Sequence, residues 1–199
     1  MIAILDYGMG NLRSVHKACE YAGLPAVLTD DVRMVENAGK IIIPGVGAFS
    51  DAMAGLQSTG LADAVKRAAK EGKYILGICI GMQVLFEKGR EGGDFDGLGL
   101  IPGEVVRLNA PRLKIPHMGW NMLEKKGDPI FDSTPGNPYV YFVHSYRAAC
   151  SDEDVIAYTG YGERFPAAVR RGNIYGFQFH PEKSGETGLK LLKNFGGLK

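Results

Sequence analysis

Cysteine is scarce in this sequence. Only three cysteines occur in 199 residues, Cys19, Cys79 and Cys150, and they lie far apart. Their odd number and spacing match neither a disulfide framework nor a zinc-ribbon motif. No cluster of His, Cys, Asp and Glu has metal-ligand spacing, so we predict no metal and no cofactor. Each cysteine therefore has to be interpreted from its own neighbours.

Excess charge of either sign is also missing. The formal net charge is +1 and there is no long basic run, so the sequence gives no electrostatic reason to expect nucleic acid or a membrane surface as a partner. No window reaches the ~18 apolar residues of a membrane span. The N-terminus MIAILDYGMGN lacks the basic start, the apolar core and the cleavage site of a signal peptide. We therefore expect a cytoplasmic protein.

The length and composition bound the number of domains. A chain of 199 residues with 45% hydrophobic and 23% charged residues fits one globular domain, residues 1–199, with a substantial core. There is no internal repeat, no low-complexity tract and no linker rich in Pro or Ser that would divide it.

The first half alternates apolar β-branched runs with helix-like segments. The expected strands are 2–7, 25–30, 40–45 and 74–79, and the expected helices are 11–23, a long one over about 48–70, and one beginning near Ile80. This alternation is typical of a doubly wound α/β fold, a mostly parallel sheet flanked by helices. Ligands of such sheets bind beyond the carboxyl ends of the strands. PGVGAF (44–49) and GICIGM (77–82) both stand at such ends, so we expect them at one rim.

The second half has shorter and more aromatic strands. They are expected at 104–108, 139–146, 154–162, 165–171 and 173–182, and a last helix is expected at 187–197. Tight turns such as RRGN (170–173) predict antiparallel pairing appended to the parallel core.

Cys79 stands between Gly77 and Gly81 where the apolar run ends. This spacing is that of a nucleophile elbow, in which glycines allow a strained strand-to-helix turn that exposes the reactive atom. A helix N-terminus would also favour the nucleophilic thiolate. A packed cysteine at the end of a buried strand fits the local pattern about equally well. The choice depends on whether the chain supplies a base.

The segment Phe179-His180-Pro181-Glu182 supplies a candidate base and an orienting acid. His180 ends an aromatic strand, and Glu182 lies two residues later across a proline, so its carboxylate can be held against the far ring nitrogen. The other histidines are weaker candidates: His16 falls in a helical surface pattern, His117 follows a proline in an irregular stretch, and His144 lies within a strand. We therefore predict His180 as the base.

An oxyanion site would need two backbone N–H groups. One would come from Ile80, the residue after the nucleophile, and the other from Gly45-Val46-Gly47 at the same rim. A simple tight turn at PGVG is the alternative. A phosphate loop is disfavoured because neither a P-loop nor a dinucleotide fingerprint is present.

The sequence resembles the class I glutamine amidotransferases that use a Cys, His and Glu triad. The resemblance is carried by GICIGMQ (77–83) and FHPEKS (179–184). Within that family, the sequence resembles more specifically the glutaminase subunits of imidazole glycerol phosphate synthases, which act in histidine biosynthesis. The blocks shared with that group are DYGMGNLRSV (6–15), PGVGAF (44–49), IPHMGWN (115–121) and YFVHSY (141–146). In order, they cover essentially the whole chain.

The resemblance implies an activity and a set of roles. Cys79 would attack the side-chain amide of glutamine, His180 would transfer the proton to the departing ammonia, and Glu182 would orient His180. Val46, Gly47 and Ile80 would form the oxyanion hole, where relatives commonly have leucine in place of Ile80. The substrate pocket would be formed by Gly47, Gln83, Glu91, His144, Ser145 and Tyr146, with Glu91 facing the α-ammonium group. Without the resemblance, Gln83 is interpreted as a polar helix residue and Glu91 as a solvated loop charge.

The resemblance also implies a partner. The family partner is a cyclase subunit with a (β/α)8 barrel, which uses ammonia to make imidazole glycerol phosphate and an aminoimidazole carboxamide ribonucleotide. The two subunits would form a heterodimer with a protected ammonia channel. His117, Trp120 and Asn121 match the interface block, and tryptophan is a favoured interface anchor. From Trp120 alone, ordinary core packing is the preferred interpretation.

Three other hypotheses remain. The chain could be the glutaminase subunit of another amidotransferase, or a thioesterase or cysteine peptidase with the same triad, which would need a broad apolar groove. It could also be a binding module, either flavodoxin-like or a pseudoenzyme. Cys19 is interpreted as a packed core thiol, and Cys150, in RAACSDED, as an unactivated residue in a turn.

Overall fold

One eight-stranded sheet organises the fold in this computed structural model, which describes all 199 residues. Its strands are β1 (Ile2–Leu5), β2 (Ala26–Thr29), β3 (Lys40–Ile43), β4 (Tyr74–Ile78), β9 (Glu124–Lys125), β12 (Val155–Tyr161), β13 (Glu163–Arg171) and β14 (Ile174–Phe177). Their order across the sheet is β2-β1-β3-β4-β14-β13-β12-β9. The first five pair in parallel, and the last three are added antiparallel. The predicted mostly parallel sheet with an antiparallel extension is confirmed.

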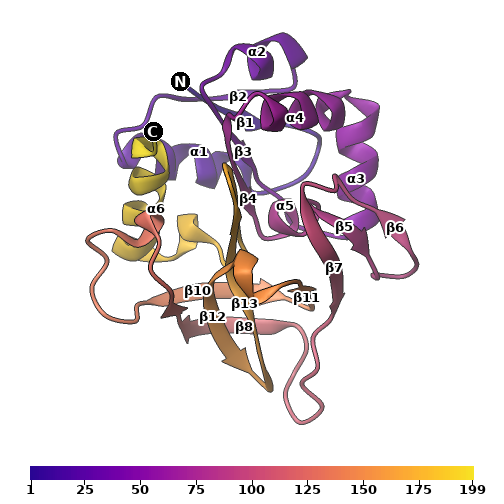
Figure 1. Cartoon of the computed structure of the whole chain (residues 1–199), viewed down its shortest axis with the longest axis vertical. Helices are drawn as coiled ribbons and strands as arrows, with labels where there is room; N and C mark the ends of the chain where they lie inside the picture. Colours follow the sequence, from indigo (N-terminus) through magenta and orange to yellow (C-terminus); the bar gives the residue numbers. More distant parts are fainter.

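Helices cover both faces of the parallel strands. They are α1 (Leu12–Tyr21), α2 (Val32–Asn37), α3 (Phe49–Ser58), α4 (Leu61–Lys70), α5 (Ile80–Gln83) and α6 (Gly185–Gly197), with 3-10 turns η1 (Pro129–Phe131), η2 (Asp152–Asp154) and η3 (Pro181–Lys183). Helices α1 and α6 pack together on one side, whereas α2 and α3 pack with α4 on the other (Figure 1). This arrangement is the doubly wound architecture that the sequence predicts.

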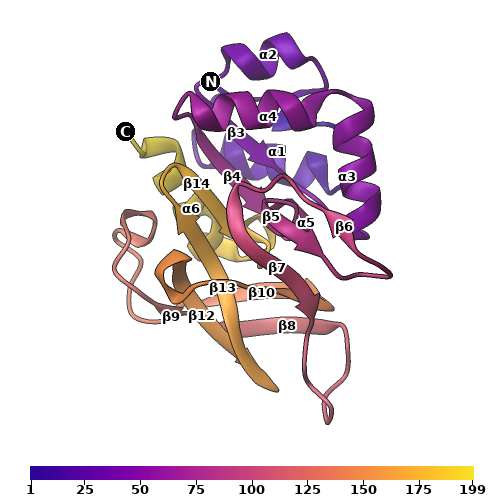
Figure 2. The same cartoon turned by 45° about the vertical axis from the view of Figure 1, so that its right-hand side comes forward.

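Two smaller sheets complete the fold. Strands β8 (His117–Met122) and β10 (Tyr139–His144) form an antiparallel pair. A four-stranded sheet has the order β11-β7-β5-β6 and is made of β5 (Phe86–Gly89), β6 (Phe95–Asp96), β7 (Ile101–Arg107) and β11 (Tyr146–Ala149). In Figure 2, β8 and β10 lie beside β12 and β13 in the lower part of the molecule.

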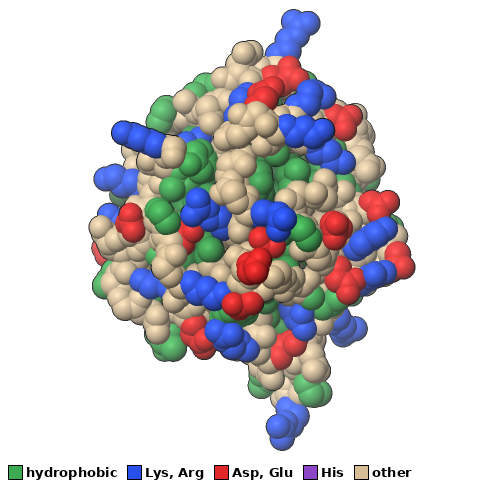
Figure 3. All heavy atoms as spheres, in the orientation of Figure 1, with side chains coloured by type: hydrophobic (Ala, Val, Ile, Leu, Met, Phe, Trp, Pro, Cys, Tyr) green, Lys and Arg blue, Asp and Glu red, His purple; other side chains and the backbone are tan.

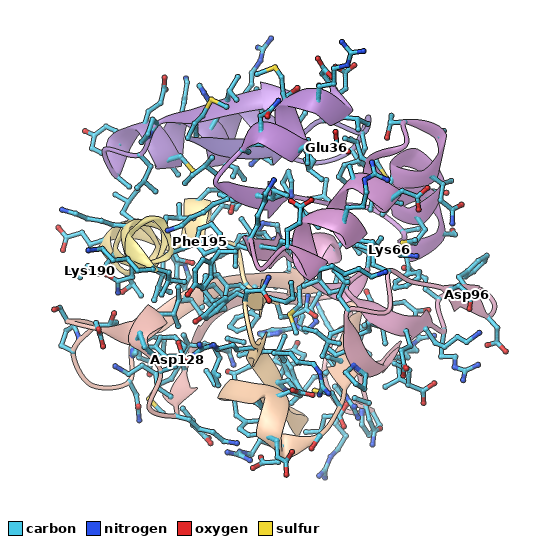
Figure 4. All side chains as sticks on the ribbon, turned by 45° about the horizontal axis from the view of Figure 1, so that its top comes forward. Glu36, Lys66, Asp96, Asp128, Lys190 and Phe195 are labelled. Carbon is cyan, nitrogen blue, oxygen red and sulfur yellow. The ribbon has the colours of Figure 1, made fainter.

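One hydrophobic cluster of 56 buried residues includes residues from Ile2 in β1 to Phe195 in α6. Figure 4 shows Phe195 on the side of α6 that faces the sheet and Lys190 on the opposite side. Charged side chains of both signs are interspersed over the face shown in Figure 3. No helix of the chain has both the length and the apolar character needed to cross a membrane.

Several predicted elements were wrong in extent. The long helix expected over about 48–70 is two helices, α3 and α4, because Gly60 between them has a φ of 74°, a left-handed conformation that ends a helix. The helix expected from Ile80 has only four residues. Helix α2 and strands β5, β6, β8 and β9 were not predicted, and His117 begins β8 rather than lying in an irregular stretch.

Strand β14 lies in the parallel core, although its segment was predicted to belong to the antiparallel extension. It pairs antiparallel with β13 on one side and parallel with β4 on the other. In that parallel register Phe177 is opposite Ile78, and the Cys79 N–H donates to the Phe177 carbonyl over 2.7 Å. The insertion therefore brings the carboxyl ends of β4 and β14, with Cys79 and His180 just beyond them, to the same place.

Candidate active site

The bend at Cys79 is strained. Cys79 has a φ of 55°, and Ser133 is the one other non-glycine residue with positive φ. Backbone strain of this kind costs about 1–3 kcal/mol and is concentrated at functional sites. The bend places Cys79 directly between β4 and α5, with its thiol at the edge of a cavity.

The two glycines around Cys79 are required by close backbone packing. A Cβ at Gly77 would lie 2.3 Å from the Gly81 carbonyl oxygen, and one at Gly81 would lie 1.8 Å from the carbonyl oxygen of Ile43 in β3. Both distances are far below van der Waals contact, so no side chain fits at either position. The G-x-C-x-G spacing thus lets β3, β4 and α5 meet backbone to backbone beneath the thiol.

His180 and Glu182 form a buried pair beside Cys79. The His180 N–H donates to the Tyr141 carbonyl over 2.9 Å, which fixes the residue just after β14. Its ring Nδ1 is 2.7 Å from Glu182 Oε1, and both side chains are 1% exposed. Since a carboxylate only accepts, Nδ1 carries the proton in this contact. The other ring nitrogen, Nε2, has no hydrogen-bond partner.

The neighbours of His180 change its proton affinity. Burial alone would lower its pKa, but the interactions with Cys79 and with the Glu182 carboxylate outweigh burial and raise the pKa to about 10. Nε2 forms no hydrogen bond in this structure, so it is free to accept the Cys79 proton. The Cys79 S–H instead donates to the Val143 carbonyl over 3.7 Å. The raised pKa makes the His180 imidazole a strong acceptor for the Cys79 proton.

A cavity of about 350 Å³ opens in front of Cys79. It is lined by Val46, Gly47, Cys79, Ile80, Gln83, Glu91, Pro116, Val143, His144, Ser145, Tyr146 and Lys183. The structure therefore brings together all the residues that the sequence analysis assigns to an oxyanion site and a substrate pocket. His180 and Glu182 lie behind Cys79 and do not line the cavity. Sequence reasoning missed Pro116, Val143 and Lys183, although each is adjacent in sequence to a predicted site residue.

Two polar side chains are fixed on the cavity wall. Gln83 is buried, and its amide nitrogen donates to the Tyr146 carbonyl over 3.0 Å and to Gln178 Oε1 over 3.1 Å. Its Oε1 has no partner and is left as an acceptor. Glu91 Oε2 accepts from the Phe49 N–H over 2.9 Å, which caps α3. Glu91 is therefore held in place by a helix end, and the interpretation as a solvated loop charge was wrong.

The loop after β3 presents unpaired backbone donors. The N–H groups of Gly45, Val46, Gly47 and Ala48 donate no hydrogen bond within the chain. Gly47 has a φ of 114°, which a side chain would strain. Val46, Gly47 and Ile80 meet at the cavity wall. Because α5 has a single turn, its dipole is small, and these local N–H groups add positive potential at the cavity wall.

A chain of hydrogen bonds runs from the cavity toward the outer face of β8. His144 Nδ1 is 2.8 Å from the Tyr146 carbonyl, and its Nε2 is 3.0 Å from His117 Nδ1. His117 Nε2 is 2.8 Å from Asn121 Oδ1. Burial lowers the pKa of His117, and it lowers the pKa of His144 to about 3. His117 has no exposed surface and Asn121 is half-buried, so a partner could touch Asn121 but not His117 in this conformation.

Trp120 points outward from β8 and is 53% exposed. The interpretation of Trp120 as a core residue was therefore wrong, because alternation along β8 puts His117 inside and Trp120 outside. Its exposed apolar neighbours on β8 and β10 are Met118, Met122 and Tyr139. We call these four residues the β8–β10 apolar patch.

The remaining cysteines are not part of the site. Cys19 is fully buried on α1, which confirms a packed thiol, and burial raises its pKa to about 12. Cys150 is half-buried after β11, and burial raises its pKa to about 11. High pKa values keep both thiols protonated and unreactive at neutral pH. No three His, Cys, Asp or Glu residues are close enough to hold a metal ion.

Comparisons with known proteins agree with this geometry. A family model described as glutamine amidotransferase class-I matches residues 3–196. The imidazole glycerol phosphate synthase subunit HisH of Caldanaerobacter subterraneus subsp. tengcongensis is 52% identical over 200 residues, covering 100% of this chain and 98% of that relative. HisH of Bacillus cereus is 48% identical, covering 100% and 95%. A crystal structure of a glutamine amidotransferase matches the fold with a TM-score of 0.78 at 21% identity, covering 99% of both chains.

Proposed function

Because the chain belongs to the class I glutamine amidotransferases, we propose that it is the glutaminase subunit of an imidazole glycerol phosphate synthase in histidine biosynthesis. Residues 1–199 act as one glutaminase domain. The observation that carries the proposal is the buried His180–Glu182 pair behind a thiol that opens into a small polar cavity. Its substrate is the side-chain amide of glutamine.

The first chemical step is attack by Cys79. His180 Nε2 takes the thiol proton, the sulfur forms a bond to the amide carbon, and the resulting oxyanion accepts hydrogen bonds from the Ile80 N–H and from the Val46 or Gly47 N–H. Unpaired donors in the loop at 44–48 support this assignment, because they need no rearrangement of existing hydrogen bonds to serve an anion.

The second step releases ammonia. Protonated His180 gives its Nε2 proton to the departing nitrogen, and the carbon–nitrogen bond breaks to leave a glutamyl thioester on Cys79. His180 then accepts a proton from water, which attacks the thioester and yields glutamate and the free thiol. Glu182 keeps Nδ1 protonated and aimed, so Nε2 faces the reacting atoms throughout.

The cavity wall selects the amino-acid end of glutamine. The free Gln83 Oε1 and the Glu91 carboxylate are acceptors suited to the α-ammonium group. Gly47, His144, Ser145 and Tyr146 complete the pocket. His144 stays neutral because its pKa is low, so it adds no charge that would compete with the ammonium.

A cyclase subunit consumes the ammonia. We place it, as a (β/α)8 barrel in a heterodimer, on the β8–β10 apolar patch, where exposed aromatic and methionine side chains provide interface anchors. Trp120 and Asn121 contact it directly, and His117 supports Asn121 from inside. Ammonia then passes from Cys79 to the cyclase without entering bulk water.

Two observations favour this function over the alternatives. A thioesterase or peptidase would need a broad apolar groove, whereas the cavity in front of Cys79 is small and carries Gln83 and Glu91. A pseudoenzyme or a flavodoxin-like binding module would not need the buried Cys79, His180 and Glu182 set. The two relatives named above, which match over the full chain length, are both subunits of an imidazole glycerol phosphate synthase. This disfavours the glutaminase subunit of another amidotransferase.

The direct test is glutamate release from glutamine with and without the cyclase. Release that is stimulated by the cyclase is the expected result, and no release in either condition would refute the glutaminase assignment. In the complex, Cys79→Ala should abolish glutamine-dependent synthesis and leave synthesis from added ammonium salts intact. Loss of both activities would instead assign Cys79 a structural role.

A further inference from the structure

Tyr7 is a buried residue beneath the loop at 44–48 that no step above uses. It follows β1 and is 4% exposed. Its hydroxyl donates a hydrogen bond to the carbonyl of Pro44, the first residue of that loop. On the other side Tyr7 packs against α3, where a Cβ at Gly55 would lie 2.5 Å from the Tyr7 carbonyl oxygen. The ring is therefore held between α3 and the loop and cannot move independently of either.

Gly45 is clamped by the same hydroxyl. A Cβ at Gly45 would lie 2.7 Å from Tyr7 Oη and 3.1 Å from the Gly81 amide nitrogen in α5. The Gly45 backbone is thus enclosed between Tyr7 and the first turn after Cys79. Gly47, two residues on, would meet Met9 Cε at 2.6 Å if it carried a Cβ. The segment Tyr7–Met9 supports the loop along its length without lining the cavity.

The contact with Pro44 sets the direction of the next donor. In a trans peptide the carbonyl and the following N–H point in opposite directions. Since Tyr7 holds the Pro44 carbonyl toward the core, the Gly45 N–H is turned away from Tyr7. The position of the Gly45–Gly47 backbone follows from this anchor, because none of its own N–H groups is hydrogen-bonded.

The hydroxyl remains a donor at every pH at which the enzyme would work. Burial raises the pKa of Tyr7 well above its ordinary value, and the nearby Cys79 raises it further.

We propose that Tyr7 is a positioning residue that fixes the oxyanion loop through Pro44, so that the loop donors meet the tetrahedral intermediate. The inference rests on the proposed glutaminase function and deepens it. A residue of this kind acts on the transition state and leaves ground-state binding of glutamine unchanged.

The test is Tyr7→Phe in the complex with the cyclase. A hydrogen bond of this kind contributes a net ~1 kcal/mol or slightly more, so kcat for glutamate release should fall about five- to tenfold. KM for glutamine should stay within about twofold, and synthesis from ammonium salts should not change. Tyr74→Phe is the matched control, because it removes a tyrosine hydrogen bond to the Lys199 carbonyl, 2.7 Å long and remote from the cavity. It should match the unmodified protein.

Gly45→Ala provides a second, independent variant. Its methyl group would displace the Tyr7 hydroxyl, so it removes the same contact from the other side. In the double variant the hydroxyl is already absent, and the loss of kcat should therefore be no greater than for Gly45→Ala alone. Nuclear magnetic resonance relaxation should show lower order parameters for the N–H groups of residues 45–48 in Tyr7→Phe, a readout that needs no turnover.

The outcomes separate this inference from the proposed function. If the unmodified protein releases no glutamate, the proposed function fails. If it is active and Tyr7→Phe retains kcat within twofold, or raises KM in proportion to the loss in kcat, the positioning role is wrong. The positioning role is also wrong if the losses in kcat of Tyr7→Phe and Gly45→Ala multiply in the double variant. Loss of ammonium-dependent synthesis would overturn it as well. Should Tyr7→Phe fail to fold, Gly45→Ala with the relaxation measurement decides.

Discussion

Glu182→Gln tests the pairing on which the chemistry of His180 depends. Glutamine has nearly the same shape, and its Oε1 can still accept from His180 Nδ1, which is 2.7 Å from the carboxylate in the native protein. The substitution removes the negative charge and also places an NH₂ group where Oε2 has no partner. The position of the His180 ring is thus largely conserved, whereas the negative charge next to it is lost.

The expected loss follows from the burial of this pair. Hydrogen bonds to charged groups contribute about 1.5–3 kcal/mol, and the upper part of the range applies because both side chains are 1% exposed. If the protonated imidazole develops fully in the transition state, kcat falls roughly 30-fold to 150-fold. KM for glutamine should change little, because neither side chain lines the cavity.

The assay is glutamate release by the complex at saturating glutamine, measured over pH. His180 must be protonated to give a proton to ammonia, and its pKa is raised to about 10 by Cys79 and Glu182 against the effect of burial. Activity should therefore persist up to about pH 10 and decline above it. Without the carboxylate the pKa falls, so this alkaline limit should move to lower pH in Glu182→Gln.

The matched control is Glu104→Gln, which breaks an exposed contact of 2.6 Å with Arg90. Exposed ion pairs contribute about 0–1 kcal/mol to stability, so its kcat should be unchanged. The reasoning about Glu182 is refuted if Glu182→Gln keeps kcat within threefold of the native value. It is also refuted if synthesis from ammonium salts falls by the same factor.

Three further predictions concern packing, pH and the partner. Gly81→Ala forces a methyl group onto the Ile43 carbonyl, so it should cost about 3 kcal/mol and lower Tm by about 6–12 °C in calorimetry, and an unchanged Tm would contradict the backbone contact. His144 stays neutral down to a pKa of about 3, chiefly through burial, whereas the unfolded chain takes up this proton near pH 6.5. The contribution of His144 to stability should therefore fall by about 2 kcal/mol from pH 7 to pH 5, and denaturant titrations should show less pH dependence in His144→Gln. Trp120→Ala should weaken cyclase binding by about 2 kcal/mol or more in calorimetric titration, whereas Tyr21→Ala, at an exposed residue on α1, should not.

The local parts of the site could be predicted from the sequence. The elbow at Cys79 and the short His180–Glu182 spacing depend on neighbouring residues, and glycine and proline restrict the backbone in ways that a single sequence reveals. The resemblance to known amidotransferases added Gln83 and Glu91, whose local sequence carries no chemical signal. Glu91 becomes interpretable only once the fold places it against the end of α3.

Strand pairing and exposure could not be predicted in the same way. Nothing local distinguishes β14 from the antiparallel strands before it, because its place beside β4 is decided by contacts about 100 residues away. Taken without the resemblance, Trp120 was assigned to the core for a similar reason. Its alternation within β8 is informative only when that strand and its partner β10 are known. The break at Gly60 is different, because here the signal is local. The helical pattern continues across Gly60, and for that reason the ability of this glycine to end the helix was overlooked.

The contact of Gly77 and Gly81 with neighbouring main chain has a consequence for how this protein can vary. Because the sulfur is placed by backbone lying on backbone, its position depends little on which aliphatic side chains fill the surrounding core. Drift or deliberate randomisation of residues such as Ile78 and Ile80 can then change stability and loop motion while the reacting atom stays where it is. The position of the nucleophilic sulfur is therefore largely independent of the core residues around it. The catalytic geometry can stay the same while the rest of the chain changes to suit new partners and temperatures.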